Sequence, residues 1–474
     1  MVASYSDLLK VQRLRSSSRD TRSILDESES DKARVLYSAS FRRLQRKTQV
    51  FPLEENAAIR SRMTHSLEVA HVGRYLSTRF LCMVDKGEAG LSRDKLGIDE
   101  SCALAISNIV ETACLLHDIG NPPFGHFGES AISNWFHGYW PEVLEKRFAG
   151  DASANRLAKD FQEFDGNPQG FRIITRVGGV DDFGMNLTVA QIASTVKYPV
   201  DPEGIGLSAV FSKKAGFFHS EGEHGKAVWE KLGLMSGARF PLAYLMEAAD
   251  DISYCLSDIE DGIEKGYLRH QDFTDALIVG VEKDAEASAF VKKALEEAQR
   301  HQDSVDVVVL FRTKIITYLV ERIARSYCEN HERIFAGQTV ELAQNDTPEH
   351  SILKAVRDVV ADLLYGKRAS HELELTGHAA MLGILRRYEG ILNLKRDDAE
   401  LLTRGGRPSK MLEEQAKLFS FLPKKHVDAY CRRAAGASDI DEWMARCHLV
   451  TDYISGMTDV FALRTYQMLS GIRV

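Results

Sequence analysis

Apolar residues recur every three to four positions over long stretches of this 474-residue chain, and only 11 prolines interrupt them. This spacing places apolar side chains on one face of an α-helix, whereas the strict alternation that is typical of strands is scarce. The clearest helical stretches are residues 66–80, 103–116, 242–263 and 306–327. The sequence therefore predicts an all-α fold, with at most a minor β-hairpin or an irregular loop at 171–187.

Composition narrows the class of protein. Hydrophobic residues make up 44% of the chain and charged residues 27%, as in ordinary globular proteins. A net charge of -8 argues against a dedicated nucleic-acid-binding protein. The seven cysteines form no Cys-x-x-Cys pair, which favours free thiols in a reducing compartment. With no apolar run of signal-peptide or membrane-spanning length, we expect a cytoplasmic protein without a membrane segment.

The length provides material for two to three domains. Breaks rich in glycine and polar residues predict loops at 164–170 and 212–225, among others. A further break at 266–273 follows the last acidic helical stretch and marks a soft domain boundary. The residues beyond it are expected to form a second helical layer.

Two distant fragments have the composition of halves of one metal site. The first, at 62–68, contains His65, and the second, at 115–126, contains the adjacent pair His117 and Asp118. Imidazole and carboxylate groups are common ligands of divalent cations. The pair ends an apolar helical stretch, and the Gly-Asn-Pro-Pro that follows stops the helix at a rim that substrate can reach. This combination predicts a metal-dependent hydrolase.

A fourth ligand is expected in the next acidic helical stretch. Asp250, Tyr254 and Asp258 are spaced i, i+4, i+8, which places them on one face of a helix. The alternative is a solvated acidic face, to which residues 260–261 would also belong. Asp251 is a rival to Asp250 as the ligand, and spacing alone does not choose between them.

The order His, His-Asp, Asp resembles the HD phosphohydrolase superfamily. More narrowly, the chain resembles the bacterial deoxyguanosinetriphosphate triphosphohydrolase (dGTPase) family. The matching strings occupy residues 40–52, 62–68, 117–129, 165–172, 197–199, 247–254 and 452–459, in the family's order. The resemblance implies the following division: an N-terminal segment (1–37), a helical HD core (38–272, with an insertion at about 133–240) and a C-terminal dGTPase-associated helical domain (273–474).

The same resemblance implies one divalent ion per subunit, held by His65, His117, Asp118 and Asp250. It favours Mn²⁺ or Mg²⁺, while histidine-plus-carboxylate ligation also suits Fe, Co, Ni or Zn. The implied reaction is hydrolysis of dGTP to deoxyguanosine and inorganic triphosphate, by attack of water on the α-phosphorus.

Further roles follow from the resemblance. His126 is expected to act as the general acid or base, with Glu129, at i+3, orienting it or polarising water. The alternative is that His126 only caps its loop. The resemblance places Arg62 and Lys197 at the phosphates, Tyr198 at the sugar, Gln49 beside base and sugar, Tyr254 under the deoxyribose, and Asp258 at the 3′ hydroxyl. Tyr254 would leave no room for a 2′ hydroxyl.

The family commonly forms ring-like or dihedral homo-oligomers, and the resemblance favours a hexamer. Basic clusters at 42–43, 46–47 and 424–425 suggest single-stranded DNA as an effector, with a solvated face as the alternative. Two rival functions remain. One is an HD phosphodiesterase of a signalling nucleotide, which would share the metal ligands. The other is a non-enzymatic HD regulatory or nucleic-acid-binding protein, against which the intact ligand set argues.

Overall fold

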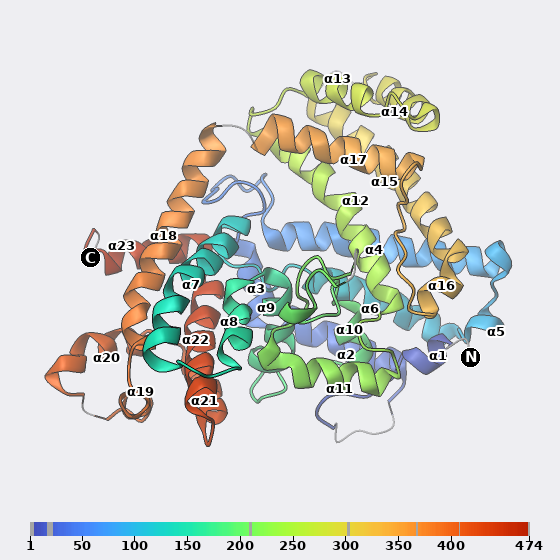
Figure 1. The fold of residues 1–474 in the computed structure, drawn as a ribbon. Coiled ribbons are helices and arrows are strands. Elements are labelled where there is room, and N and C mark those ends of the chain that lie inside the picture. Colours follow the sequence, from blue (N-terminus) through green and yellow to red (C-terminus); the bar gives the residue numbers. More distant parts are fainter. Residues whose placement is uncertain are drawn as a thin grey trace.

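The computed structural model describes residues 4–16, 22–207, 211–300, 304–365, 368–406 and 408–472. Within these residues the chain is helical and contains no β-strand, which confirms the predicted all-α fold (Figure 1). Isolated antiparallel bridges join Arg13 to Thr188 and Thr48 to Ser61. The second of these bridges closes the loop that precedes the helix carrying His65.

Buried hydrophobic side chains form two clusters, each built from its own set of helices. The helices of the first cluster are α1 (Tyr5–Leu8), α2 (Ile24–Leu36), α3 (Ala39–Arg43), α4 (Arg62–Asp85), α5 (Arg93–Leu96), α6 (Glu100–Leu116), α9 (Gly166–Arg172), α10 (Val189–Ser194), α11 (Gly222–Leu232), α12 (Pro241–Glu264), α13 (His270–Gly280), α14 (Ala285–Ala298), α15 (Ser304–Glu329), α16 (His331–Phe335) and α17 (Pro348–Val360). The helices of the second cluster are α7 (His126–Arg147), α8 (Ala154–Gln162), α18 (Arg368–Leu392), α19 (Arg396–Thr403), α20 (Glu413–Ser420), α21 (Lys424–Ala434), α22 (Asp439–Ser455) and α23 (Asp459–Leu469). Short helical turns connect them: η1 (Leu44–Arg46), η2 (Glu88–Gly90), η3 (Ile173–Val177), η4 (Pro202–Gly204), η5 (His219–Glu221), η6 (Ala361–Tyr365) and η7 (Lys410–Leu412).

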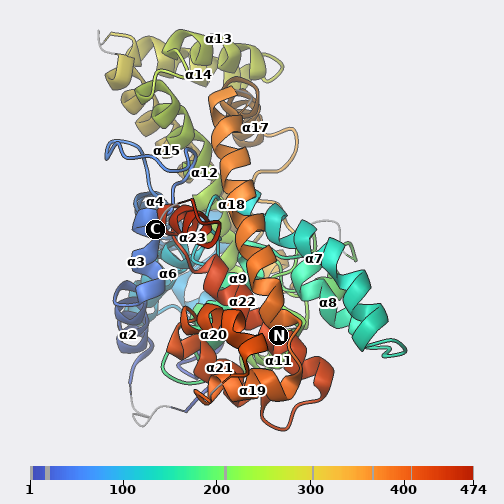
Figure 2. The same cartoon turned by 90° about the vertical axis from the view of Figure 1, so that its left-hand side faces the viewer.

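The two clusters lie side by side, and α12 runs through the first of them. It packs against α4, α6 and α15, while α18 packs along α7 and α23 in the second cluster. Two orthogonal views place α13 and α14 at one end of the molecule and α19 to α21 at the other (Figures 1 and 2). The residues predicted to bind metal come from α4, α12 and the end of α6, and His126 begins α7.

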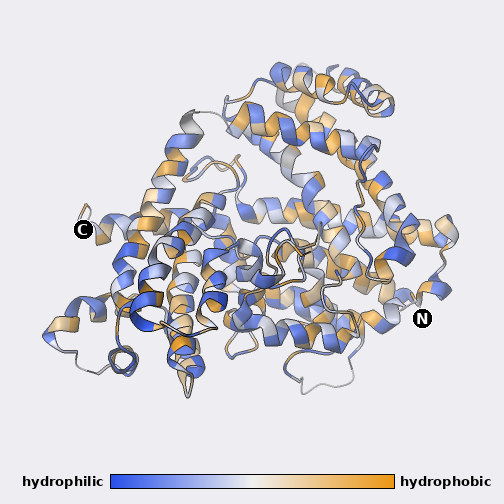
Figure 3. Cartoon of the chain, viewed as in Figure 1, coloured by the Kyte–Doolittle hydropathy of each residue, from blue (hydrophilic) through white to orange (hydrophobic). Residues whose placement is uncertain are grey.

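The four long stretches predicted to be helical lie within α4, α6, α12 and α15, which confirms them. Hydrophobic and hydrophilic residues interleave along these helices, as amphipathic packing requires (Figure 3). Among the described residues, no helix has the length and apolar composition that crossing a membrane requires. The described cysteine side chains are free thiols, and that of Cys255 is not among them.

The loop predicted at 164–170 is wrong, because most of this segment forms α9. Asp165 caps the helix by accepting a hydrogen bond from the backbone N–H of Asn167 at 2.9 Å, and Pro168 lies in the first turn, where proline is tolerated. Its glycines permit contact between backbones: a Cβ at Gly120 would lie 2.1 Å from the oxygen of Gly166. Glycine here allows close approach and does not end the helix.

The segment 171–187, predicted as a hairpin or an irregular loop, contains the end of α9, the π-helical turn η3 and irregular backbone. No strand forms in it. Gly178 and Gly179 lie in the loop after η3, and a Cβ at Gly179 would meet the backbone oxygen of Gly184. The irregular-loop alternative is therefore the one the structure adopts.

Candidate active site

A cavity of about 600 Å³ opens where the two hydrophobic clusters meet. Every residue predicted for the site lines it except Asp258. The predicted residues on its wall are Gln49, Arg62, His65, His117, Asp118, His126, Glu129, Lys197, Tyr198, Asp250 and Tyr254. The fold thus brings together residues as far apart in the sequence as Gln49 and Tyr254.

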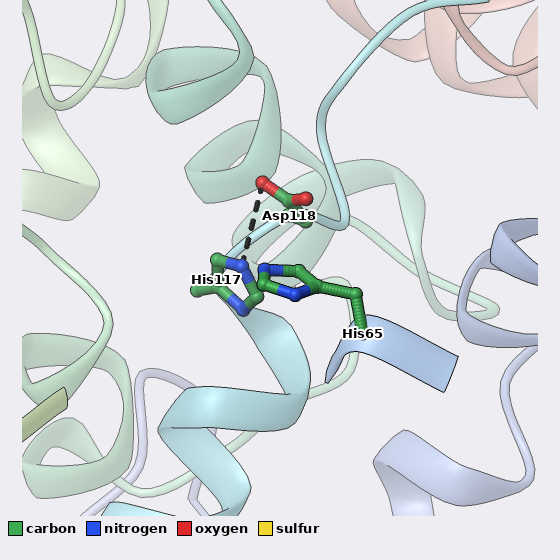
Figure 4. A group of neighbouring side chains, drawn as sticks. All are labelled: His65, His117 and Asp118. Atoms are coloured by element: carbon green, nitrogen blue, oxygen red, sulfur yellow. Dashed lines mark ion pairs between the residues drawn. The ribbon is translucent and has the colours of Figure 1, made fainter. Parts of the chain in front are cut away.

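Three of the predicted metal ligands converge within this cavity (Figure 4). One ligand atom from each of His65, His117 and Asp118 lies within 4.8 Å of the others. Ser61 sets the position of His65, because its side chain caps α4 by accepting from the backbone N–H of Thr64. His65 is thereby held on the first turn of α4, where it faces the end of α6.

Asp250 projects from α12 toward the same point. Its Oδ1 lies 3.4 Å from Nε2 of His65 and 3.4 Å from Nε2 of His117. Asp251, the alternative ligand, is an exposed residue on the cavity wall and makes no such contact. The geometry therefore favours Asp250 over Asp251 as the fourth ligand.

The hydrogen bonds around the histidines show which ring nitrogens are available. Nδ1 of His117 lies 2.6 Å from the backbone oxygen of Cys114, so that nitrogen carries the hydrogen and Nε2 keeps its lone pair. Nε2 of His117 and both ring nitrogens of His65 are buried and have no hydrogen-bond partner. Backbone anchoring of the far nitrogen is typical of metal-ligating histidine.

Two cations flank the carboxylates of this centre. Arg62 donates to Oδ2 of Asp118 at 2.6 Å, and Lys197 donates to Oδ2 of Asp250 at 2.6 Å. Burial alone would raise the pKa of both carboxyl groups. The positive charge of Arg62 lowers the pKa of Asp118, and that of Lys197 lowers the pKa of Asp250. Both side chains are therefore ionised, and positive charge lies at the rim for an anionic substrate.

His126 and Glu129 form a pair on the first turn of α7. Nδ1 of His126 lies 2.7 Å from Oε2 of Glu129, and Oε1 of Glu129 accepts from the backbone N–H of Gly166 at 2.8 Å. The hydrogen bond to Glu129 raises the pKa of His126. The His126 side chain is 76% exposed and that of Glu129 is 10% exposed. A buried carboxylate thus orients a ring whose other nitrogen is free to reach substrate.

The turn before His126 has left-handed backbone at Phe124 (φ 63°) and Gly125 (φ 56°). A Cβ at Gly125 would lie 2.7 Å from Nη2 of Arg62, so glycine is needed there for both conformation and space. The backbone N–H of Phe124 donates to Oδ1 of Asp459 at 3.1 Å. That contact holds the strained turn in place.

Asp459, at the start of α23, also fixes the loop that carries Gln49. Its Oδ2 accepts from the backbone N–H of Thr48 at 2.9 Å and from the Thr48 hydroxyl at 2.6 Å. The neighbouring Lys47 is buried and donates to the backbone oxygens of Asn121 and Ser455. Burial lowers the pKa of Lys47 to about 7. Helix α23 therefore braces two loops of the cavity. The string 452–459 matched the family in sequence, but these contacts of Asp459 were not predicted from it.

Comparison with known proteins agrees with this geometry. Residues 62–152 match the model of the HD domain, and residues 407–468 match that of the phosphohydrolase-associated domain. The chain is 34% identical to the probable deoxyguanosinetriphosphate triphosphohydrolase of Pseudomonas aeruginosa, over 96% of this chain and 94% of that protein. It is also 34% identical to the deoxyguanosinetriphosphate triphosphohydrolases of Yersinia enterocolitica (96% and 95% covered) and Klebsiella pneumoniae (95% and 95% covered).

The chain belongs to the deoxyguanosinetriphosphate triphosphohydrolase family. The resemblance to this family is thereby confirmed. The HD-domain match spans His65, His117, Asp118, His126 and Glu129, whereas Asp250 lies beyond it on α12. The candidate fourth ligand of this family member thus lies on a helix outside the matched segment.

The donor set of this dGTPase family member fits a divalent ion. Two imidazole nitrogens and two carboxylates surround one point, and the buried imidazole nitrogens have no hydrogen-bond partner. Leaving such groups unsatisfied is costly, and a metal ion satisfies them together. The residues present therefore suit the divalent metal that HD phosphohydrolases require.

Several residues of the cavity were missed from the sequence, and Tyr365 is the one that contacts two predicted residues. Tyr365, at the end of η6, lines the cavity, hydrogen-bonds to the hydroxyl of Tyr254 and donates to Oδ2 of Asp258 at 2.5 Å. Asp258 is fully buried behind the two tyrosines, and its Oδ1 has no partner. Burial raises the pKa of Asp258 to about 7. The tyrosine pair therefore separates Asp258 from the cavity in this structure.

Proposed function

We propose that this protein hydrolyses dGTP to deoxyguanosine and inorganic triphosphate by attack of water on the α-phosphorus. One observation carries the proposal: a centre suited to a divalent metal and the His126–Glu129 pair line the same cavity. The names of the relatives support dGTP as the substrate. The implied role is control of deoxynucleotide pools.

His65, His117, Asp118 and Asp250 would hold the ion, and we propose Mn²⁺ or Mg²⁺, with Fe, Co, Ni or Zn as alternatives. When bound, the metal supplies Lewis-acid polarisation of a phosphoryl oxygen and lowers the pKa of a water. Arg62 and Lys197 pair with Asp118 and Asp250 in the structure, and we propose that they also stabilise negative charge on the phosphates.

His126 is proposed as the general acid. Glu129 holds Nδ1 of its ring, so protonated Nε2 faces the substrate and gives its proton to the departing 5′ oxygen. The bond between that oxygen and the α-phosphorus breaks as the oxygen of water bonds to phosphorus, and the attacking water releases a proton to solvent. Because Glu129 raises the pKa of His126, more of the ring is protonated at neutral pH than in an isolated histidine.

The remaining residues are proposed to bind the nucleoside. Gln49 has a buried side-chain oxygen without a partner, which suits a hydrogen bond to base or sugar. Tyr198 would border the sugar, and Tyr254 would lie under it and exclude a 2′ hydroxyl. For Asp258 to reach the 3′ hydroxyl, Tyr365 must give up its hydrogen bond, so this role requires rearrangement on binding.

The wider setting is also a proposal. We propose a cytoplasmic homo-oligomer, most simply a hexamer, divided into residues 1–37, 38–272 and 273–474. The free thiols support a reducing compartment. Single-stranded DNA as an effector rests on fewer cations than the sequence suggested, because Lys47 is buried.

The test is a product assay on the metal-loaded protein. The four dNTPs and GTP are supplied with Mn²⁺, and nucleoside, phosphate and triphosphate are separated. Deoxyguanosine with intact triphosphate, lost in Asp118→Ala, is the expected result. No turnover of any dNTP by protein with confirmed bound metal would refute the proposal and favour a phosphodiesterase or a regulatory HD protein.

A further inference from the structure

A second polar cavity lies at the opposite end of α9 from Glu129. It has a volume of about 80 Å³ and shares no lining residue with the first cavity. Its walls come from α8, α9, η3, η5, α21 and α22, so it lies between the two hydrophobic clusters. Gly166 at the start of α9 binds Glu129, and Arg172 at its end lines the second cavity.

Three buried histidines line this second cavity, and each has one ring nitrogen without a hydrogen-bond partner. The unpartnered atoms are Nε2 of His219, Nδ1 of His426 and Nδ1 of His448. The side chains of His219 and His448 are 3% and 2% exposed, and His426 is 9% exposed. Buried polar atoms normally have a partner, and three exceptions around one small cavity make it a candidate ligand site.

The opposite ring nitrogens of two of these histidines are fixed. Nε2 of His448 lies 2.9 Å from the hydroxyl of Ser220, and that hydroxyl donates to Glu221 at 2.6 Å. Ser220 is thus the acceptor, and Nε2 of His448 carries a hydrogen. Nδ1 of His219 lies 3.1 Å from a carboxylate oxygen of Asp201 and also carries one. All three residues line the cavity, and protonation of their unpartnered nitrogens would turn these atoms into hydrogen-bond donors.

The carboxylates around the second cavity are already occupied. Asp452 accepts from Arg172 and from Gln169, and Asp160 accepts from two backbone N–H groups of η5. Asp441, on the rim, accepts from the Ser438 hydroxyl at 2.6 Å. The acids therefore leave little acceptor capacity directed inward.

Two arginines around the second cavity, in contrast, have N–H groups that donate to no acceptor among the described residues. Arg176 uses Nε on Glu221 and Nη2 on the backbone oxygen of Ser220, which leaves Nη1 free. Arg433, an exposed residue at the mouth, makes no ion pair or hydrogen bond with any residue that the structure describes. Guanidinium N–H groups without an acceptor, next to imidazoles that can be protonated, suit an oxyanion. Arginine presents several N–H donors in one plane, and these match the oxygens of a phosphate.

We propose that this second cavity binds one phosphate group, through Arg433, Arg176 and the three histidines. At roughly 10–15 Å³ per water, the cavity has room for about five to eight waters or one tetrahedral oxyanion. A nucleoside does not fit inside. The ligand is therefore inorganic phosphate or the phosphate of a nucleotide whose base and sugar stay outside.

The test is calorimetric binding of inorganic phosphate to the metal-loaded full chain. The variant Arg433→Gln/His426→Gln removes one cation and one histidine of the second cavity. The matched control is Arg432→Gln, which removes the adjacent charge, whose side chain instead pairs with Asp182. Phosphate that binds at the catalytic metal is unaffected by either change, so the difference between variants reports on the second cavity.

We expect the double variant to bind phosphate at this site roughly tenfold or more weakly, as the loss of charge-assisted hydrogen bonds implies, and the control to bind as the wild type does. Arg433→Gln alone, an exposed change that does not threaten folding, should weaken binding in the same direction. Equal phosphate binding by wild type and both variants would overturn the proposal. A second titration, with AMP present, identifies the natural ligand. If AMP competes with inorganic phosphate, the site binds the phosphate of a nucleotide. If phosphate binds and AMP does not compete, the site binds the free ion.

Discussion

The Arg13 cluster and the metal centre both bury charged side chains, but they differ in how those charges are satisfied. Arg13 binds Glu27, Asp31 and the backbone oxygen of Asn186, and the second oxygen of Asp31 accepts from Thr188. No fully buried side-chain nitrogen or oxygen of this cluster lacks a hydrogen-bond partner. At the metal centre, by contrast, buried imidazole nitrogens face two carboxylates without any hydrogen bond.

The difference separates structural charge from functional charge. In the Arg13 cluster the buried polar atoms already bind one another, so no group is left to bind a ligand. Substitution of a residue there should therefore affect folding alone. At the metal centre, buried nitrogen lone pairs have no partner within the chain, so a bound ligand would stabilise them. Substitution of a residue there should therefore affect catalysis before it affects folding. The following predictions test that separation.

The largest effect is expected from Asp250→Asn. Loss of an ionised ligand should remove the bound metal and abolish dGTP hydrolysis, while Asp251→Asn should retain both. Metal content by elemental analysis and product formation check this. Chelation of the wild type should reproduce the loss, and added Mn²⁺ should restore activity in the wild type only. Equal activity of the two variants would show that Asp250 is not a ligand.

His126→Gln should lower kcat by about 10²–10⁴-fold, the usual contribution of a general acid. Bound metal and thermal stability should stay unchanged, because the His126 side chain is largely exposed and touches no ligand. Single-turnover kinetics provide the measurement. A variant that retains full kcat would assign His126 to capping its turn.

Arg13→Met should lower the free energy of unfolding by about 3–5 kcal/mol, since it leaves two buried carboxylates without their cation. Turnover per folded molecule should not change. Denaturant unfolding monitored by circular dichroism, combined with active-site titration, separates the two quantities. Lys424→Met, at an exposed pair with Asp428, is the matched control and should change stability far less.

Asp459→Asn should reduce kcat/KM by up to about 100-fold without loss of metal. An amide cannot accept from both the Phe124 N–H and the two Thr48 donors, so one of the two loops is released, and small misplacements of this kind are costly. Steady-state kinetics with parallel metal analysis check this. Unchanged kinetics would make the brace purely structural.

The smallest expected effect is on pH dependence. The carboxylate of Glu129 raises the pKa of His126, so the acid form persists to higher pH and activity falls as pH rises through that raised pKa. In Glu129→Gln the fall in kcat should therefore move to lower pH. A pH profile of kcat for both proteins measures this, and a shift toward higher pH would contradict the general-acid role.

Local patterns in the sequence predicted much of this architecture. Helical periodicity identified α4, α6 and α12, and the i, i+4 spacing placed Asp250 and Tyr254 on one face because a helix has a fixed repeat. Tyr365 was missed, since its position depends on a π-helical turn that no spacing rule indicates. The contacts of Asp459 were missed because Thr48 is 411 positions away, and only tertiary packing joins them.

That long separation has a consequence for synthesis of the protein. All four proposed metal ligands have left the ribosome once Asp250 has emerged, whereas the carboxylate that fixes Thr48 and Phe124 comes at 459. A nascent chain thus contains its metal centre well before its substrate loops are braced. Translation products that stop between these points would carry the ligands without an ordered pocket, so catalytic competence arrives only with the last helices.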